Sequence, residues 1–66
     1  MPVVKIDLWK GRNKEQKKKL IEKVTDAIVE SISCPKDAVQ IIISETDKDN
    51  WGIAGELASE KFPDKK

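Results

Sequence analysis

In this 66-residue sequence, Pro2 stands directly after Met1, where its backbone nitrogen could become a base at neutral pH. Methionine aminopeptidases remove Met1 when the second residue is small, and removal would leave Pro2 with a free secondary amine. The chain has no histidine. An α-amino group, with an ordinary pKa of about 7.7–8.0, then starts closest to the value near 7 that proton transfer requires. In an apolar pocket beside a cation this pKa would fall, and the neutral amine could abstract a proton or add to a carbonyl.

Taken alone, a proline after Met1 indicates only that the start methionine can be removed.

Cys34 precedes Pro35 at the end of a predicted helix, where the helix dipole disfavours a thiolate and no histidine can activate one. We interpret Cys34 as a small packing residue. Asp7, Glu45 and Glu56 fit surface or hairpin-stabilising carboxylates better than catalytic ones.

The composition excludes several classes of function. Thirteen basic and twelve acidic residues give a net charge of +1, without the concentrated basic surface that nucleic-acid binding requires. The run 17–19 of three lysines is typical of a solvated helix face. One cysteine and no histidine cannot make a structural zinc site. No apolar stretch approaches the roughly 20 residues of a membrane span, and no signal peptide opens the chain, so we expect a cytoplasmic protein.

The length of the chain indicates association. Sixty-six residues make one domain, 1–66, in which we expect 59–66 to be a frayed tail. A domain of this size buries only about 60% of its unfolded surface. Disulfides, metals or partner subunits usually support such domains, and the first two are missing from this sequence. The sequence therefore predicts a homo-oligomer.

Hydrophobic periodicity predicts a strand and then a helix. Val3–Trp9 alternates apolar and polar residues, as a half-buried strand does. After a turn at 10–12, Asn13 and Gln16 form a capping-box pattern that opens a helix over Lys14–Ile32.

The second half of the chain predicts another strand and a hairpin. Residues 39–44 are rich in β-branched side chains, and 51–55 could form a short hairpin after the polar turn at 47–50. Two strands joined by a crossover helix are expected to be parallel. The predicted fold is α+β, a β-α-β subunit with a parallel strand pair and a short C-terminal hairpin. Its sheet would keep a bare face and bare edges, which is an association surface.

Several segments together resemble a known family, without an evident gap from Pro2 to about residue 59. A proline follows the start methionine, Gly-Arg ends the first strand, and an aromatic-Gly-Ile hairpin is followed by Gly-Glu-Leu-Ala. In this combination the sequence resembles the 4-oxalocrotonate tautomerase family, also called 2-hydroxymuconate tautomerases. The segments are Pro2-Val3-Val4-Lys5-Ile6, Gly11-Arg12, Glu15-Gln16-Lys17 and Trp51-Gly52-Ile53-Ala54-Gly55-Glu56-Leu57-Ala58.

The resemblance implies a hexamer built as a trimer of dimers, and enol–keto tautomerisation of unsaturated 2-hydroxy or 2-oxo acids in aromatic-compound catabolism. It implies no metal and no cofactor. Pro2 matches the family's general base and Arg12 an arginine that holds a substrate carboxylate. The remaining matches are pocket residues: Trp51, where the family commonly has phenylalanine, with Trp9 and Ile53 lining the same pocket.

Gln40 departs from the family pattern, because well-studied members carry a second arginine here that binds the substrate near the reacting oxygen. Glutamine can donate a hydrogen bond but brings no charge. Losing such a cation could cost about 3–4 kcal/mol of transition-state stabilisation, by analogy with an oxyanion-hole donor. This weakens the case for dicarboxylate substrates such as 2-hydroxymuconate. Lys36 or Lys48 could compensate, but the sequence places neither.

Geometry tests part of the implied site. A strand separates Pro2 from Arg12 by roughly 20 Å, at about 3.3 Å per residue. If both act on one substrate, Arg12 must come from a neighbouring subunit. The simpler interpretation of Arg12 is a surface charge paired with Asp7 or Glu15.

Two alternatives to a tautomerase remain open. Decarboxylation, hydration or dehalogenation of unsaturated acids could use the same proline amine. The chain could also be a non-catalytic oligomeric scaffold, which Gln40 favours and the pair Pro2 and Arg12 opposes. A scaffold would tolerate a retained Met1, whereas an amine base would not.

Overall fold

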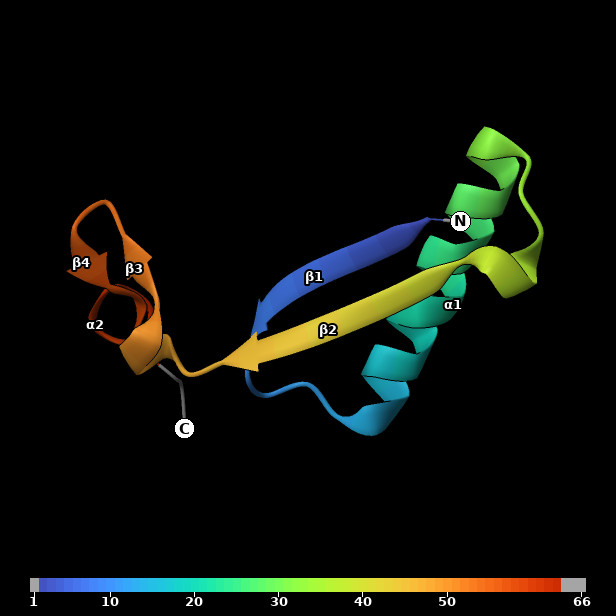
Figure 1. The fold of residues 1–66 in the computed structure, drawn as a ribbon. Coiled ribbons are helices and arrows are strands. Elements are labelled where there is room, and N and C mark those ends of the chain that lie inside the picture. The colour runs from blue at the N-terminus through green and yellow to red at the C-terminus, as the bar shows by residue number, and fades with distance from the viewer. Residues whose placement is uncertain (1, 64–66) are drawn as a thin grey trace.

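The computed structural model describes residues 2–63 and shows a β-α-β unit followed by a small hairpin unit. Figure 1 shows the two long strands side by side, the long helix along one face of the pair, and the hairpin beyond the far end of the second strand. The strands are β1 (Val3–Trp9), β2 (Gln40–Thr46), β3 (Gly52–Ile53) and β4 (Glu56–Leu57); the helices are α1 (Lys14–Ile32) and α2 (Ala58–Lys61), with short 3-10 turns at Lys36–Ala38 and Lys48–Asn50.

Strands β1 and β2 pair in parallel, as the sequence predicts. The register runs from Val3 opposite Gln40 to Trp9 opposite Thr46. Along β1 the side chains alternate between exposed and half-buried up to Leu8, so that one face of the sheet meets the helix. The second strand begins and ends later than the predicted 39–44, because pairing with the last residues of β1 extends it through Thr46.

Helix α1 has the bounds that the sequence predicts. Asn13 accepts a hydrogen bond from the backbone of Gln16 at 2.8 Å, and the Gln16 side chain accepts one from the backbone of Asn13 at 3.0 Å, which completes the capping box. The helix ends at Ser33, which adopts a left-handed φ of 56° and donates its N–H to Val29. Leu20, Val24 and Ile28 are the half-buried residues whose helical spacing the sequence shows.

The C-terminal segment is a hairpin with a helical turn. Strands β3 and β4 pair antiparallel across Ala54 and Gly55, both with positive φ, so the predicted hairpin is confirmed. The expectation of a frayed tail from residue 59 is wrong for its first part, because Ala58–Lys61 forms α2. Phe62 then packs on Trp9, with ring centroids 5.7 Å apart. Residues 64–66 lie outside the described residues.

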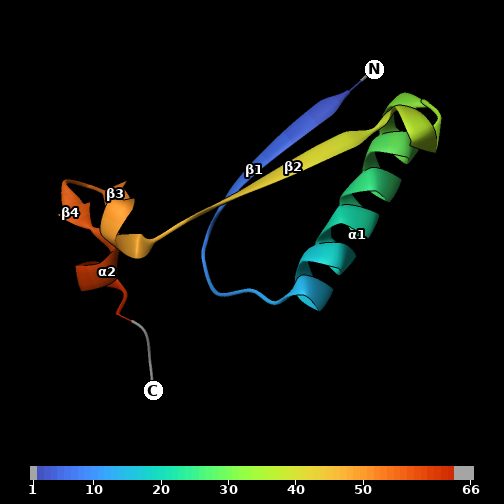
Figure 2. The same cartoon turned by 60° about the horizontal axis from the view of Figure 1, so that its bottom comes forward.

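The single chain encloses almost no core. Among residues 2–63 only Ala58 is buried. The radius of gyration is 14.9 Å, whereas a compact chain of this length would have about 11 Å. Figure 2 shows the cause, since the hairpin unit lies away from the sheet and α1. Six large apolar side chains stay exposed: Val3, Ile21, Ile32, Ile42, Leu57 and Phe62.

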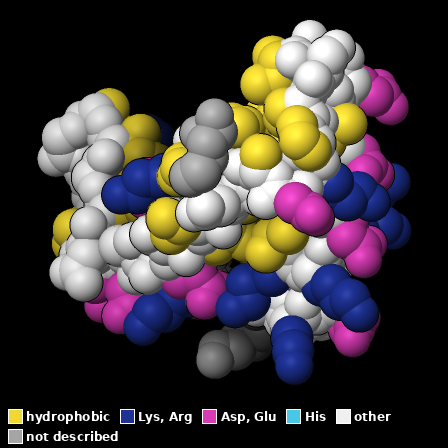
Figure 3. All heavy atoms as spheres, turned by 45° about the vertical axis from the view of Figure 1, so that its right-hand side comes forward, with side chains coloured by type: hydrophobic (Ala, Val, Ile, Leu, Met, Phe, Trp, Pro, Cys, Tyr) yellow, Lys and Arg dark blue, Asp and Glu magenta, His cyan; other side chains and the backbone are white. Residues whose placement is uncertain are grey.

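Hydrophobic and charged side chains are unevenly distributed on the face drawn in Figure 3. Figure 3 shows hydrophobic side chains gathered over the upper part of one face, while charges of both signs are interspersed below and to the right. No helix within residues 2–63 is long and apolar enough to cross a membrane. An apolar surface on a chain with so little core is typical of a protein interface.

Candidate functional site

Pro2 and Gln40 lie side by side at the end of the sheet where β1 begins. The backbone N–H of Gln40 donates a hydrogen bond to the carbonyl oxygen of Pro2 at 3.1 Å. Pro2 is half-buried and Gln40 is exposed. Sheet pairing thus holds the proline in place and sets a neutral polar residue beside it. The state of Met1 lies outside the described residues.

Arg12 lies at the opposite end of β1, after a tight turn. Gly11 has a φ of +132°, which lets the chain leave the strand and enter the helix cap. The Arg12 guanidinium donates to the carbonyl of Trp9 at 3.4 Å. Arg12 is exposed beside this turn, as the simpler interpretation expects. Within residues 2–63 no carboxylate lies within ion-pair distance of Arg12, so the suggested pair with Asp7 or Glu15 is not formed within one chain. The charge of the guanidinium stays available.

The Pro2 end and the Arg12 end of β1 are called here the two half-sites. Two tryptophans form the apolar part of the half-site at the Arg12 end. The rings of Trp9 and Trp51 meet edge to face, with centroids 5.9 Å apart and planes at 81°, a favoured aromatic geometry. Lys48 places its ammonium 4.9 Å from the centre of the Trp9 ring and donates to the Phe62 carbonyl at 2.6 Å. Lys48 therefore stands at the Trp9 end of the sheet and does not replace a cation beside Gln40 within one chain.

A cavity of about 180 Å³ opens between these residues. Its lining consists of Asp7, Leu8, Trp9, Arg12 and Trp51. A guanidinium beside two indoles suits a small organic anion, because the rings exclude water while the cation binds a carboxylate. Ile53 is half-buried on β3 but does not line this cavity.

The indole N–H of Trp9 has no hydrogen-bond acceptor among residues 2–63, although its nitrogen is buried. Buried donors are nearly always paired in folded proteins. A partner for the Trp9 indole N–H is therefore expected from outside these residues, as a second subunit could provide.

Some residues of this site escaped prediction. Asp7 is exposed, as expected of a surface carboxylate, but its place in the cavity lining was not foreseen. Phe62, which falls in the expected tail, packs on Trp9. Phe62 had one signal, since it is the only aromatic residue in an otherwise polar C-terminal stretch. Cys34 is half-buried at the end of α1, in agreement with a packing role.

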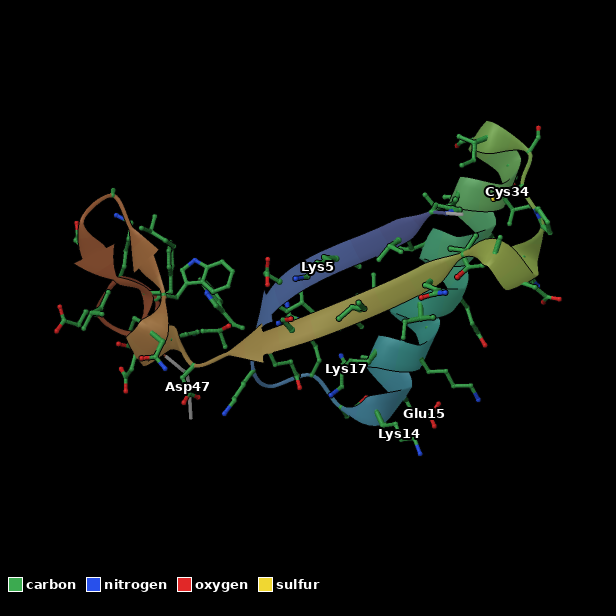
Figure 4. All side chains as sticks on the ribbon, in the orientation of Figure 1. Lys5, Lys14, Glu15, Lys17, Cys34 and Asp47 are labelled. Atoms are coloured by element: carbon green, nitrogen blue, oxygen red, sulfur yellow. The ribbon has the colours of Figure 1, made fainter. Side chains whose placement is uncertain are left out.

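The chain does not bring the two half-sites together. The seven residues of β1 separate Pro2 from Arg12, which amounts to about 23 Å at 3.3 Å per residue. In Figure 4, Cys34 marks the end of the molecule where β1 starts, and Asp47 marks the end where β2 leads into the hairpin unit. No rotation of one arginine side chain spans this separation.

Comparison with known proteins agrees with the fold and with the family resemblance. The model of the family described as tautomerase enzyme matches residues 2–61. The 2-hydroxymuconate tautomerase of Comamonas testosteroni is 48% identical over 60 residues, covering 91% of this chain and 95% of that protein.

Solved structures show the same architecture. A 4-oxalocrotonate tautomerase isozyme from Methylibium petroleiphilum superposes with a TM-score of 0.88 at 30% identity, covering 91% of this chain and 94% of the other. A heterohexameric 4-oxalocrotonate tautomerase from Chloroflexus aurantiacus gives 0.87 at 28% identity, covering 91% and 97%. The predicted fold and family resemblance are confirmed, and this chain belongs to the tautomerase enzyme family, whose members are keto–enol isomerases.

Proposed function

We propose that this chain is one subunit of a cytoplasmic homo-oligomeric tautomerase acting on unsaturated 2-hydroxy or 2-oxo acids. The amine of Pro2, freed by removal of Met1, is the general base, and Arg12 of a neighbouring subunit binds the substrate carboxylate. One observation carries this proposal: Pro2 and Arg12, which forms no ion pair within residues 2–63, lie at opposite ends of the same strand. Two subunits related by a symmetry axis can bring such ends together.

In the proposed reaction the neutral amine of Pro2 accepts the proton of the enol hydroxyl. The resulting ammonium returns a proton to a carbon of the conjugated chain, and the oxygen becomes a carbonyl. Arg12 fixes the carboxylate throughout, while Trp9 and Trp51 keep water away from the reacting atoms. Gln40, beside Pro2, can donate a hydrogen bond to the oxygen on which negative charge develops. No metal or cofactor is needed, because both proton transfers use one amine.

The open core supports association. With only Ala58 buried among residues 2–63 and six large apolar residues exposed, the chain lacks the burial that supports a stable monomer. A relative of similar fold is a heterohexamer by its own description. We propose a hexamer, a trimer of dimers, in which 1–66 is a single domain.

Subunit mixing tests the shared site. Protein whose mass shows that Met1 is absent is assayed for ketonisation of 2-hydroxymuconate and of a simpler enol acid by ultraviolet absorbance. Pro2→Ala and Arg12→Ala should each abolish most activity. When the two variants are unfolded together and refolded as a mixture, about a quarter of the sites should regain both residues if Pro2 and Arg12 come from different subunits.

Recovered activity in the mixture would establish the shared site, and its absence with two soluble oligomeric variants would refute it. Equal activity in wild type and Pro2→Ala would remove Pro2 from the mechanism.

The neutral Gln40 beside Pro2 is the observation that favours a second candidate, which is decarboxylation, hydration or dehalogenation of an unsaturated acid by the same amine. Wild-type protein that ketonises neither acid but consumes such a substrate would establish that candidate. A non-catalytic scaffold would neither ketonise the enol acids nor consume such a substrate.

A further inference from the structure

The cavity at the Trp9 end holds two opposite charges that do not neutralise each other. Asp7 and Arg12 both line it. Neither forms an ion pair with any residue of the part of the chain that is described, nor does the Asp7 carboxylate accept a hydrogen bond there. A substrate group that enters the cavity therefore meets both a cation and a carboxylate that have no ion-pair partner among residues 2–63.

Asp7 reaches the cavity because of the strand register. It lies opposite Ser44 in the parallel pair, on the exposed side of β1. Successive side chains of a strand point to opposite faces, so Asp7 and Trp9 share the face that α1 does not cover. Two lysines also lie near Trp9, and both have partners of their own. Lys48 donates to the Phe62 carbonyl, and Lys10 pairs with Asp47 at 3.6 Å.

We propose, resting on the proposed function, that Asp7 is a specificity-determining residue that restricts the site to acids with one carboxylate. Arg12 binds that carboxylate. A second carboxylate on the same molecule would be repelled by Asp7, and Gln40 at the Pro2 end offers it no positive charge. The preferred substrate is a monoanionic 2-hydroxy or 2-oxo acid whose distal end is uncharged.

The test compares two substrates in one assay, 2-hydroxymuconate with two carboxylates and 2-hydroxypentadienoate with one. The measured quantity is the ratio of kcat/KM for the dicarboxylate to kcat/KM for the monocarboxylate. Asp7→Asn should raise this ratio about tenfold, equivalent to ~1.4 kcal/mol, mainly through a lower KM for the dicarboxylate. Asp26→Asn, the same change on the exposed side of α1, is the matched control and should leave the ratio unchanged.

Ionic strength gives a second readout that a merely structural role would not move. Salt screens repulsion between exposed charges. Raising the salt concentration should therefore increase the ratio in wild type and have a smaller effect in Asp7→Asn. Binding of the unreactive pair adipate and hexanoate, followed by tryptophan fluorescence, should show the same change in selectivity without turnover.

The competing role for Asp7 is an ion pair with Lys5 of a second copy, since both residues lie exposed on the same face of β1. In that case the Asp7→Asn oligomer would be weaker, and it would fall apart at protein concentrations at which wild type stays assembled. The ratio of kcat/KM for the two substrates would not change. Either that result or an unchanged ratio in an intact oligomer would overturn the inference. Activity that survives Pro2→Ala would instead overturn the proposed function, and in that case the binding ratio of adipate to hexanoate still decides the role of Asp7.

Discussion

Gln40 donates its backbone N–H to the carbonyl oxygen of Pro2 at 3.1 Å, and this bond fastens the second residue of the chain to the central strand pair. The nitrogen of Pro2 is therefore held at the very end of a sheet and not on a loose terminus. Because its ring leaves no side-chain rotamers to order, a base in this position is preorganised.

The first prediction concerns the covalent state of Pro2. Protein that retains Met1 has an amide nitrogen in this position, without basicity, and should lose the roughly 10²- to 10⁴-fold contribution of a general base. Mass spectrometry of separated processed and unprocessed fractions, each assayed for ketonisation, checks this. Equal specific activity in the two fractions would exclude the amine as the base.

Replacing the neutral neighbour of Pro2 should broaden substrate choice. Gln40→Arg adds a cation at the Pro2 end, so kcat/KM for a dicarboxylate should rise about tenfold, the effect of ~1.4 kcal/mol in an opposite-charge contact. Gln40→Glu is the matched variant of opposite charge and should lower it. The prediction fails if Gln40→Arg and Gln40→Glu change kcat/KM for the dicarboxylate and for the monocarboxylate by the same factor.

Arg12 should act through its charge and its planar fork. Arg12→Ala should lower kcat/KM by about 10- to 200-fold, corresponding to the 1.5–3 kcal/mol of a charge-assisted hydrogen bond. Arg12→Lys should recover only part of this loss, since an ammonium cannot bind a carboxylate in bidentate fashion. Lys10→Ala removes an exposed cation paired with Asp47 at 3.6 Å and serves as the control that keeps activity.

Stability should depend on the cap of α1. Asn13→Ala removes the acceptor for the Gln16 backbone N–H and should lower the free energy of unfolding by about 1 kcal/mol. Urea unfolding followed by circular dichroism at one fixed protein concentration measures this change. Lys14→Ala, an exposed substitution one residue later, should have little effect, and an equal loss in both variants would contradict the role of the cap.

Local patterns were enough to predict most of the fold. The alternation along β1 and the capping box at Asn13 each depend on neighbours a few residues apart, so both are legible in the sequence. The end of β2 was not, because its last residues become strand only by pairing with Leu8 and Trp9.

The candidate site divides in the same way. Pro2 was singled out by the chemistry of a terminal amine and Arg12 by the family resemblance, and strand length placed the two residues apart. Asp7 in the cavity and Phe62 on Trp9 were missed, since such contacts join residues whose spacing carries no periodic signal. Charge type alone does not tell whether a carboxylate faces solvent or a binding cavity.

The near absence of buried residues, with Ala58 alone in residues 2–63, also sets the order of events in folding. A newly made chain buries little apolar surface until it meets another copy. Folding of the chain and association of the subunits are therefore expected to occur in one step. Refolding should then be second order in protein, slowing on dilution, whereas self-sufficient domains of this size fold at rates that do not change with concentration.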